Sequence, residues 1–123
     1  MNQTTEKRPL VLVVDDDESM RELLRKQMEL DGYRVALAEN GLRAVEATEE
    51  DIPDVVLLDA KMPAMDGFQV AEALKASERT RTVPVIMVTV LDDHFSRLRA
   101  LKAGVPFLTP NTWRVDVAES FSK

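Results

Sequence analysis

A short, unbroken apolar run near the middle of the chain, residues 55–58, constrains the fold more than any other feature of the sequence. Such a run, bounded by polar and turn residues, is typical of a strand that is covered on both faces. Asp59 ends the run, and residues 61–67 then lead toward a helical pattern. In open α/β sheets, ligands bind in the crevice outside the carboxyl ends of the strands. The pattern therefore indicates Asp59 as the leading functional candidate.

Strand-like runs and helical patterns alternate along the rest of the chain. Further strands are expected at residues 10–14, 33–38, 84–88 and 105–108. Helices are expected at residues 19–30, 41–51, 68–76 and 93–103, with a final short helix around Trp113, Val117 and Phe121. Ser19 and Glu22 have the spacing of a capping box at the first helix. Because crossovers between parallel strands are almost always right-handed, this alternation predicts an α/β fold with a doubly wound, five-stranded parallel sheet and helices on both faces.

Length, charge and composition narrow the class of protein. At 123 residues the chain is long enough to bury one core, and we divide it into a polar N-terminal lead, residues 1–9, and one domain, residues 10–123. The formal net charge of −6 argues against nucleic acid or an anionic membrane surface as a direct partner. The sequence has no cysteine for disulfides or thiolate metal sites, and no apolar run approaches the roughly 18 residues of a membrane span. The lead also lacks the apolar core of a signal peptide, so we expect a cytoplasmic domain.

Acidic residues follow two of the expected strands. Asp15 and Asp16 come directly after residues 10–14, and Asp59 ends the central run. If these strands are neighbours, the carboxylates converge, and like charges at that distance require either a proton or a cation among them. Mg²⁺ is held in proteins by one or two carboxylates together with waters, and an aspartate can also act as a nucleophile toward phosphorus. Thr89, at the end of another strand, could donate its hydroxyl to a phosphoryl oxygen.

Four spaced motifs make this interpretation more specific. They read V-L-V-V-D-D-D-E-S, P-D-V-V-L-L-D-A-K-M-P-A-M-D-G, V-P-V-I-M-V-T and A-L-K-A-G. Together, over about residues 10–109, they resemble the receiver domain of bacterial two-component response regulators. The resemblance implies a flavodoxin-like sheet with the strand order 2-1-3-4-5.

The resemblance also implies a role for individual residues. Asp59 would accept a phosphoryl group from a sensor histidine kinase or a phosphotransfer protein. Asp15, Asp16, Asp59 and the backbone carbonyl of Lys61 would hold Mg²⁺. Thr89 matches the switch hydroxyl of the family, and Phe107 matches its aromatic switch. The domain would catalyse its own phosphorylation and dephosphorylation rather than turn over a substrate as a conventional enzyme does.

The expected output of such a domain is a change in a protein-binding face. This face would comprise the expected fourth helix, residues 93–103, the fifth strand, residues 105–108, and the last helix. The same face could form a homodimer. The sequence does not distinguish a complete protein from a piece of a longer one, and it contains no segment that we interpret as an output domain.

One motif departs from the family pattern. The family has Leu-Thr-Lys-Pro after the aromatic residue of the fifth strand, whereas Pro110 stands here at the lysine position and Asn111 at the proline position. The family lysine contacts the phosphoryl group and couples it to the switch. A second hypothesis follows, in which the domain is a degenerate receiver that acts as a phosphorylation-independent interaction module.

A third hypothesis is a phosphatase of the haloacid dehalogenase type, because Asp15 and Asp17 form an Asp-x-Asp motif after a strand. That family requires Thr or Val two places after the second aspartate, and Ser19 stands there. Turnover of a soluble phosphomonoester would be its signature.

Overall fold

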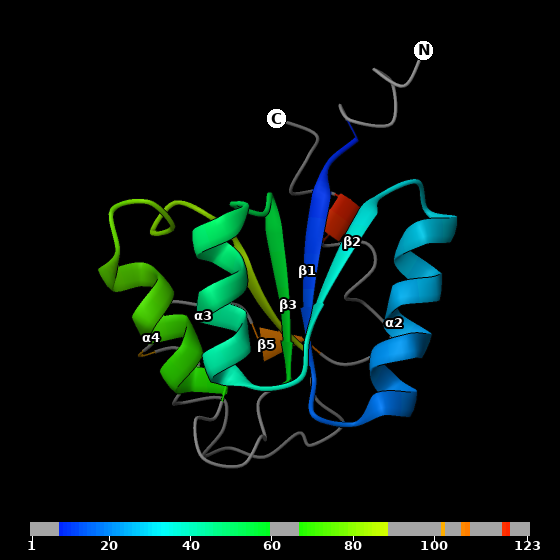
Figure 1. Cartoon of the computed structure of the whole chain (residues 1–123), viewed down its shortest axis with the longest axis horizontal. Coiled ribbons are helices and arrows are strands. Elements are labelled where there is room, and N and C mark those ends of the chain that lie inside the picture. The colour runs from blue at the N-terminus through cyan, green and yellow to red at the C-terminus, as the bar shows by residue number, and fades with distance from the viewer. Residues whose placement is uncertain (1–7, 60–66, 89–101, 103–106, 109–116, 119–123) are drawn as a thin grey trace.

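The computed structural model places a parallel sheet between two layers of helices (Figure 1). It describes residues 8–59, 67–88, 102, 107–108 and 117–118. The elements in chain order are β1 (Leu10–Val14), α2 (Glu18–Leu30), β2 (Arg34–Ala38), α3 (Gly41–Glu50), β3 (Val55–Asp59), α4 (Gly67–Ala76), β4 (Val85–Val88) and β5 (Phe107–Leu108).

The first four strands lie in the order β2-β1-β3-β4, and all neighbouring pairs are parallel. This order confirms the expected flavodoxin-like arrangement for these strands. The two residues of β5 pair with β4, where Phe107 lies opposite Met87 in the register. Residues 105 and 106 of the expected fifth strand lie outside the described residues, so a complete fifth strand stays a prediction.

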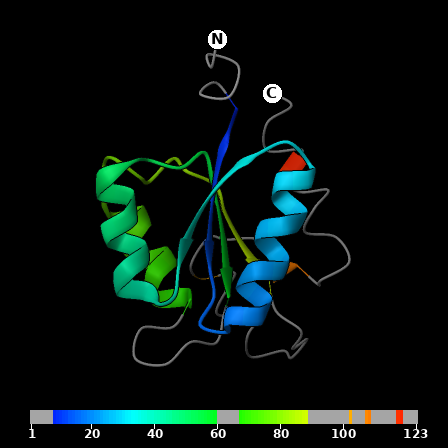
Figure 2. The same cartoon turned by 45° about the vertical axis from the view of Figure 1, so that its right-hand side comes forward.

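Alternate residues of the strands build two cores, one on each face of the sheet. The core under α3 and α4 contains Leu12, Val14, Ala38, Ala44, Val56, Leu58, Phe68, Val70, Ala71, Leu74, Val83, Val85 and Met87. The core under α2 contains Val11, Val13, Leu24, Met28, Val55, Leu57, Ile86 and Val117. Figure 2 shows α2 and α3 on opposite sides of the sheet. The prediction that the central apolar runs are covered on both faces is therefore confirmed.

Local signals explain where the helices begin and end. Asn40 caps α3 by accepting a 2.8 Å hydrogen bond from the backbone N–H of Arg43. Gly32, which follows the end of α2, has φ of 98°, a left-handed conformation that glycine adopts without steric cost. The capping-box prediction for Ser19 is wrong. The N-cap is Asp17, whose carboxylate accepts a 2.9 Å bond from the Ser19 N–H, because α2 already begins at Glu18.

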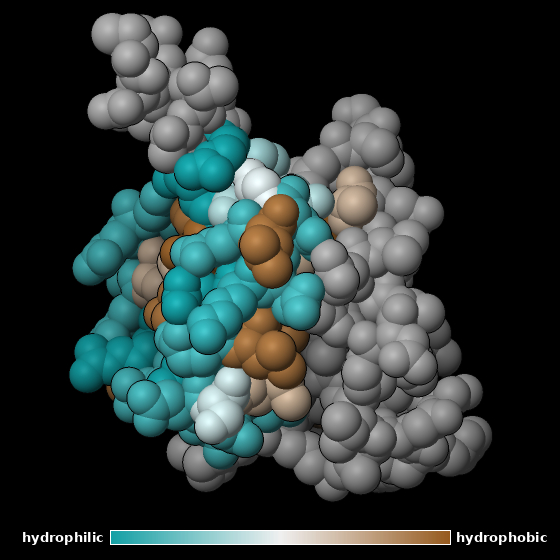
Figure 3. All heavy atoms as spheres, turned by 90° about the vertical axis from the view of Figure 1, so that its right-hand side faces the viewer, coloured by the Kyte–Doolittle hydropathy of each residue, from teal (hydrophilic) through white to brown (hydrophobic). Residues whose placement is uncertain are grey.

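The surface over α2 is largely hydrophilic but carries separate apolar groups (Figure 3). On this helix, Leu30 is 81% exposed and Leu23 is 51% exposed. Within the described part of the chain, no helix has both the length and the apolar character that crossing a membrane requires.

Candidate functional site

The sheet brings the predicted carboxylates together at its carboxyl edge. β1 and β3 are neighbours, with Val14 opposite Leu58 in the register, so Asp15 and Asp59 leave the sheet side by side. Carboxylate oxygens of Asp15, Asp16 and Asp59 all lie within 4.8 Å of one another. The convergence expected from the two strand ends is therefore present, whereas the roles of these residues stay predictions.

The three carboxylates differ in their surroundings. Asp15 is only 6% exposed, whereas Asp16 is exposed and Asp59 lies between these extremes. Asp15 is held at three points: its N–H donates to the Ala38 carbonyl at 3.2 Å, its carboxylate accepts from the Asp17 N–H at 2.9 Å, and its carbonyl accepts from the Arg21 guanidinium at 2.8 Å. Three hydrogen bonds thus hold Asp15, the most buried residue of the cluster: two at its main chain and one at its carboxylate.

Burial raises the pKa of the Asp15 carboxyl above its ordinary value. The hydrogen bond from the Asp17 N–H opposes this rise, the negative charges of Asp16 and Asp17 add to it, and the charge of Arg21 opposes it. The net effect on the pKa is upward because the loss of hydration is the largest contribution. Asp15 therefore carries its charge at a free-energy cost that a bound cation would reduce.

This raised pKa predicts that Asp15→Asn stabilises the cation-free protein at neutral pH. Between the ordinary carboxyl pKa and the raised one, the folded state binds more protons than the unfolded state, so wild-type stability falls as pH rises through that window. Above this pH window, the wild-type protein has lost the whole contribution of Asp15 protonation to its stability. The variant has no such charge, and its amide oxygen can still accept the bond from Asp17. Urea denaturation in a chelator, from about pH 4 to about pH 7, should show the fall only in wild type. A variant less stable than wild type at neutral pH would contradict the expectation.

The donor set fits Mg²⁺. This ion prefers oxygen ligands, uses only one or two carboxylates in many sites and retains several waters. The cluster supplies carboxylate oxygens at close range: the charge of Asp15 is disfavoured by burial, Asp59 is half-buried and Asp16 is exposed. Magnesium would therefore relieve repulsion among the carboxylates without needing a fully enclosed cage.

Several residues of the predicted site lie outside the part of the chain that the structure describes. Lys61 and Thr89 lie outside the described residues, as do Pro110 and Asn111 at the departing motif. The backbone of Phe107 lies beside β4, at its carboxyl half, in the register given above. The structure therefore does not test the proposed carbonyl ligand or the two switch residues.

Sequence reasoning missed Arg21. This residue lies in the first turns of α2, where its position among polar and apolar residues gives no sign of a contact with the acidic cluster. The only available signal was its place six residues after Asp15, because a long side chain there can reach back over the loop.

Comparisons with known proteins agree with this geometry. The family model for the response regulator receiver domain matches residues 11–108. Response regulator PleD of Caulobacter vibrioides is 41% identical over 100 residues, which are 80% of this chain and 22% of PleD. Response regulator MprA of Mycobacterium ulcerans is 35% identical over 106 residues, which are 86% of this chain and 45% of MprA. The chain thus spans less than half the length of these relatives.

Solved structures show the same fold. The receiver domain of a signal transduction histidine kinase from Syntrophus aciditrophicus superposes with a TM-score of 0.85 at 31% identity, over 93% of this chain and 90% of that one. The chemotaxis protein CheY4 of Vibrio cholerae also gives a TM-score of 0.85, at 24% identity, over 93% of this chain and 99% of that one. The second likeness concerns the fold alone.

Proposed function

Because the chain belongs to the response regulator receiver domain family, we propose that it is a signalling domain that accepts a phosphoryl group on Asp59. The observation that carries the proposal is the convergence of the Asp15, Asp16 and Asp59 carboxylates within 4.8 Å at the carboxyl edge of the sheet. Membership of this family also removes the support for the haloacid dehalogenase hypothesis.

The proposed step transfers a phosphoryl group from a phosphohistidine of a sensor kinase or phosphotransfer protein. A carboxylate oxygen of Asp59 forms a bond to phosphorus, and the bond between phosphorus and the imidazole nitrogen breaks. The electron pair of that bond leaves with the imidazole, which takes up a proton from solvent. The product on this chain is an acyl phosphate. Such transfers depend on positioning and charge neutralisation more than on acid–base groups.

The surrounding residues would serve those two needs. Asp15 and Asp16, with Asp59 and the Lys61 carbonyl, would hold Mg²⁺. The ion would neutralise the phosphoryl oxygens and the carboxylates that face them. The fixed main chain of Asp15 keeps its carboxylate in place before any ligand arrives.

We extend the proposal to the output. Thr89 and Phe107 would couple phosphorylation to a binding face formed by the expected fourth helix, the fifth strand and the last helix. This face would bind a partner protein or a second copy of the chain. We place the domain in the cytoplasm, where a kinase partner can reach Asp59.

The second candidate is a degenerate receiver that binds its partners without phosphate. The observation that favours it is Pro110 at the position of the family lysine. Because proline offers neither a charge nor an N–H donor, it cannot replace the lysine contact with the phosphoryl group. The two candidates differ in whether an acyl phosphate forms.

Incubation with a small acyl phosphate donor distinguishes the phosphorylatable domain from the degenerate receiver. The phosphorylatable domain should gain one phosphoryl group by intact-mass analysis in Mg²⁺, lose it in alkaline buffer and gain none in a chelator. A protein that binds Mg²⁺ and yet remains unmodified, both by the small donor and by phosphorylated kinases, would instead be the degenerate interaction module.

A further inference from the structure

Arg21 closes a ring over the loop that carries two of the three carboxylates. Its guanidinium donates to the carbonyl of Asp15 at 2.8 Å, and its own backbone N–H donates to the carbonyl of Asp17 at 2.9 Å. The side chain is half-buried, as it must be to lie along the loop. The acidic loop, residues 15–17, is thus bonded to the first turns of α2 through both the side chain and the main chain of one residue.

The Arg21 side chain bonds the peptide group that joins Asp15 to Asp16. The N–H of Asp15 is fixed to β2 through Ala38, so the peptide group that follows Asp15 is the nearest point at which the loop can rotate. Arg21 holds the carbonyl of that same peptide group. The N–H of this peptide group belongs to Asp16. A rotation of the peptide group would therefore move the Asp16 carboxylate relative to those of Asp15 and Asp59.

We propose that Arg21 is a positioning residue that holds the acidic loop in the conformation that binds a divalent cation. The inference rests on the proposed function, because the cation is the one expected at that site. Arg21 would act through the Asp15 carbonyl and would not itself contact the ion. With Arg21 in place, the loop needs little rearrangement when the ion binds, and less of the binding free energy is spent on ordering it.

Charge alone predicts the opposite effect. A guanidinium near three carboxylates repels a divalent cation, so removing it should tighten binding if Arg21 acted only through its charge. Removing a positioning contact should weaken binding. The sign of the change in Mg²⁺ affinity therefore distinguishes the two roles.

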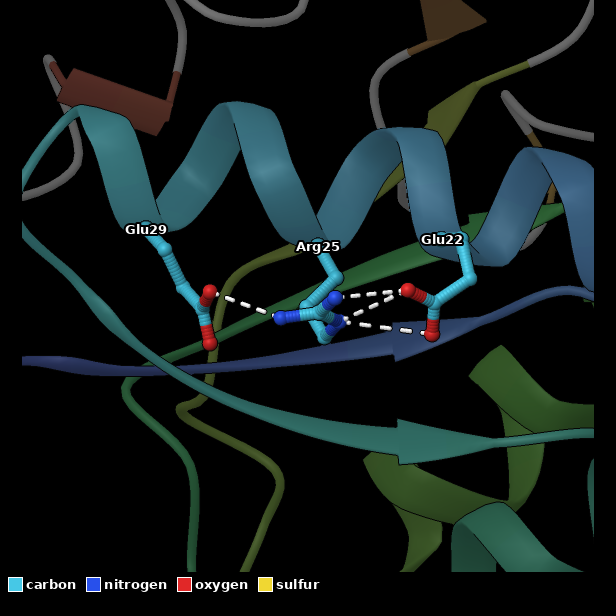
Figure 4. Close-up of polar contacts among 3 residues, drawn as sticks. All are labelled: Glu22, Arg25 and Glu29. Carbon is cyan, nitrogen blue, oxygen red and sulfur yellow. Dashed lines mark hydrogen bonds and ion pairs between the residues drawn. The ribbon is translucent and has the colours of Figure 1, made fainter.

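The chain offers a matched control in Arg25, one turn further along α2. Its guanidinium pairs with Glu22 at 2.6 Å and with Glu29 at 2.8 Å (Figure 4). These bonds stay within the helix and do not involve the acidic loop. Arg25→Ala thus removes the same charge from the same helix without removing the bond to Asp15.

The experiment measures the Mg²⁺ dissociation constant by NMR titration of wild type, Arg21→Ala, Arg21→Lys and Arg25→Ala. We expect Arg21→Ala to raise the dissociation constant about tenfold, the effect of losing one hydrogen bond from a charged donor. Arg21→Lys keeps the charge but not the planar donor group, so its affinity should fall between those of wild type and Arg21→Ala. Arg25→Ala should change the constant by less than about twofold, because its bonds to Glu22 and Glu29 stay within α2 and ion pairs at the surface contribute little. Thermal denaturation in a chelator confirms that each variant is folded.

Each outcome decides a different question. Unchanged or tighter Mg²⁺ binding by Arg21→Ala would overturn the positioning role while leaving the proposed function intact. If that variant does not fold, Arg21→Lys decides: wild-type affinity overturns the inference, and weakened affinity supports it. Wild type that binds no Mg²⁺ would contradict the proposed function, and the inference would fall with it.

Discussion

Replacing Asp59 with asparagine should abolish the phosphoryl adduct. The substitution keeps the size of the side chain at the end of β3 but replaces the carboxylate with an amide, which is too weak a nucleophile to displace the leaving group from phosphorus. With a small acyl phosphate donor and Mg²⁺, we expect a full mass shift of one phosphoryl group in wild type and none in Asp59→Asn. Intact-mass spectrometry of both proteins under identical conditions measures the difference.

An aspartate away from the cluster provides the control. Asp51 is exposed at the end of α3 and precedes β3 rather than following it. Asp51→Asn should be phosphorylated as wild type is, which would exclude a general effect of removing one negative charge. A labile adduct of equal yield on Asp59→Asn would place the phosphoryl group on another residue and contradict the assignment.

Much of the fold is predictable because its strands are buried on both faces. A continuous apolar run such as residues 55–58 has few alternatives to a central parallel strand, and proline and aspartate residues mark its boundaries. The first four strands accordingly lie as expected. The residues of β2 are mostly half-buried because this strand lies at the edge of the sheet.

The sequence predicts the carboxylates of the candidate site but not the residue that contacts the loop carrying them. Strand ends that share an edge bring Asp15 and Asp59 together, since parallel neighbours end on the same side. The contact between Arg21 and the Asp15 carbonyl was not predictable, because it depends on the dihedral angles of the intervening loop rather than on periodicity. The same loop explains the wrong capping prediction. Both Asp17 and Ser19 are suitable N-cap residues, and because the helix already begins at Glu18, Asp17 is the residue that caps it.

Truncating the core beneath α2 should cost more stability than any surface change in this chain. Leu57 lies in β3 between Val13 and Ile86 in the register and is 1% exposed. Leu57→Ala should lower the free energy of unfolding by about 2 to 5 kcal/mol, because it loses the burial of the side chain and leaves a cavity that the rigid sheet cannot fill. That loss is a large part of the roughly 5 to 15 kcal/mol that stabilises a typical domain. Urea denaturation followed by circular dichroism measures it.

The same substitution at Leu30 isolates the contribution of burial. Leu30 ends α2 and is 81% exposed, so Leu30→Ala removes the same atoms from water-exposed surface and introduces a residue with slightly better helix propensity. Its effect should lie within about 0.5 kcal/mol of wild type. If both substitutions cost the same, β3 would not be the buried centre of the sheet. A large cost at Leu57 alone would instead show that burial of the apolar run stabilises the strand that ends at Asp59.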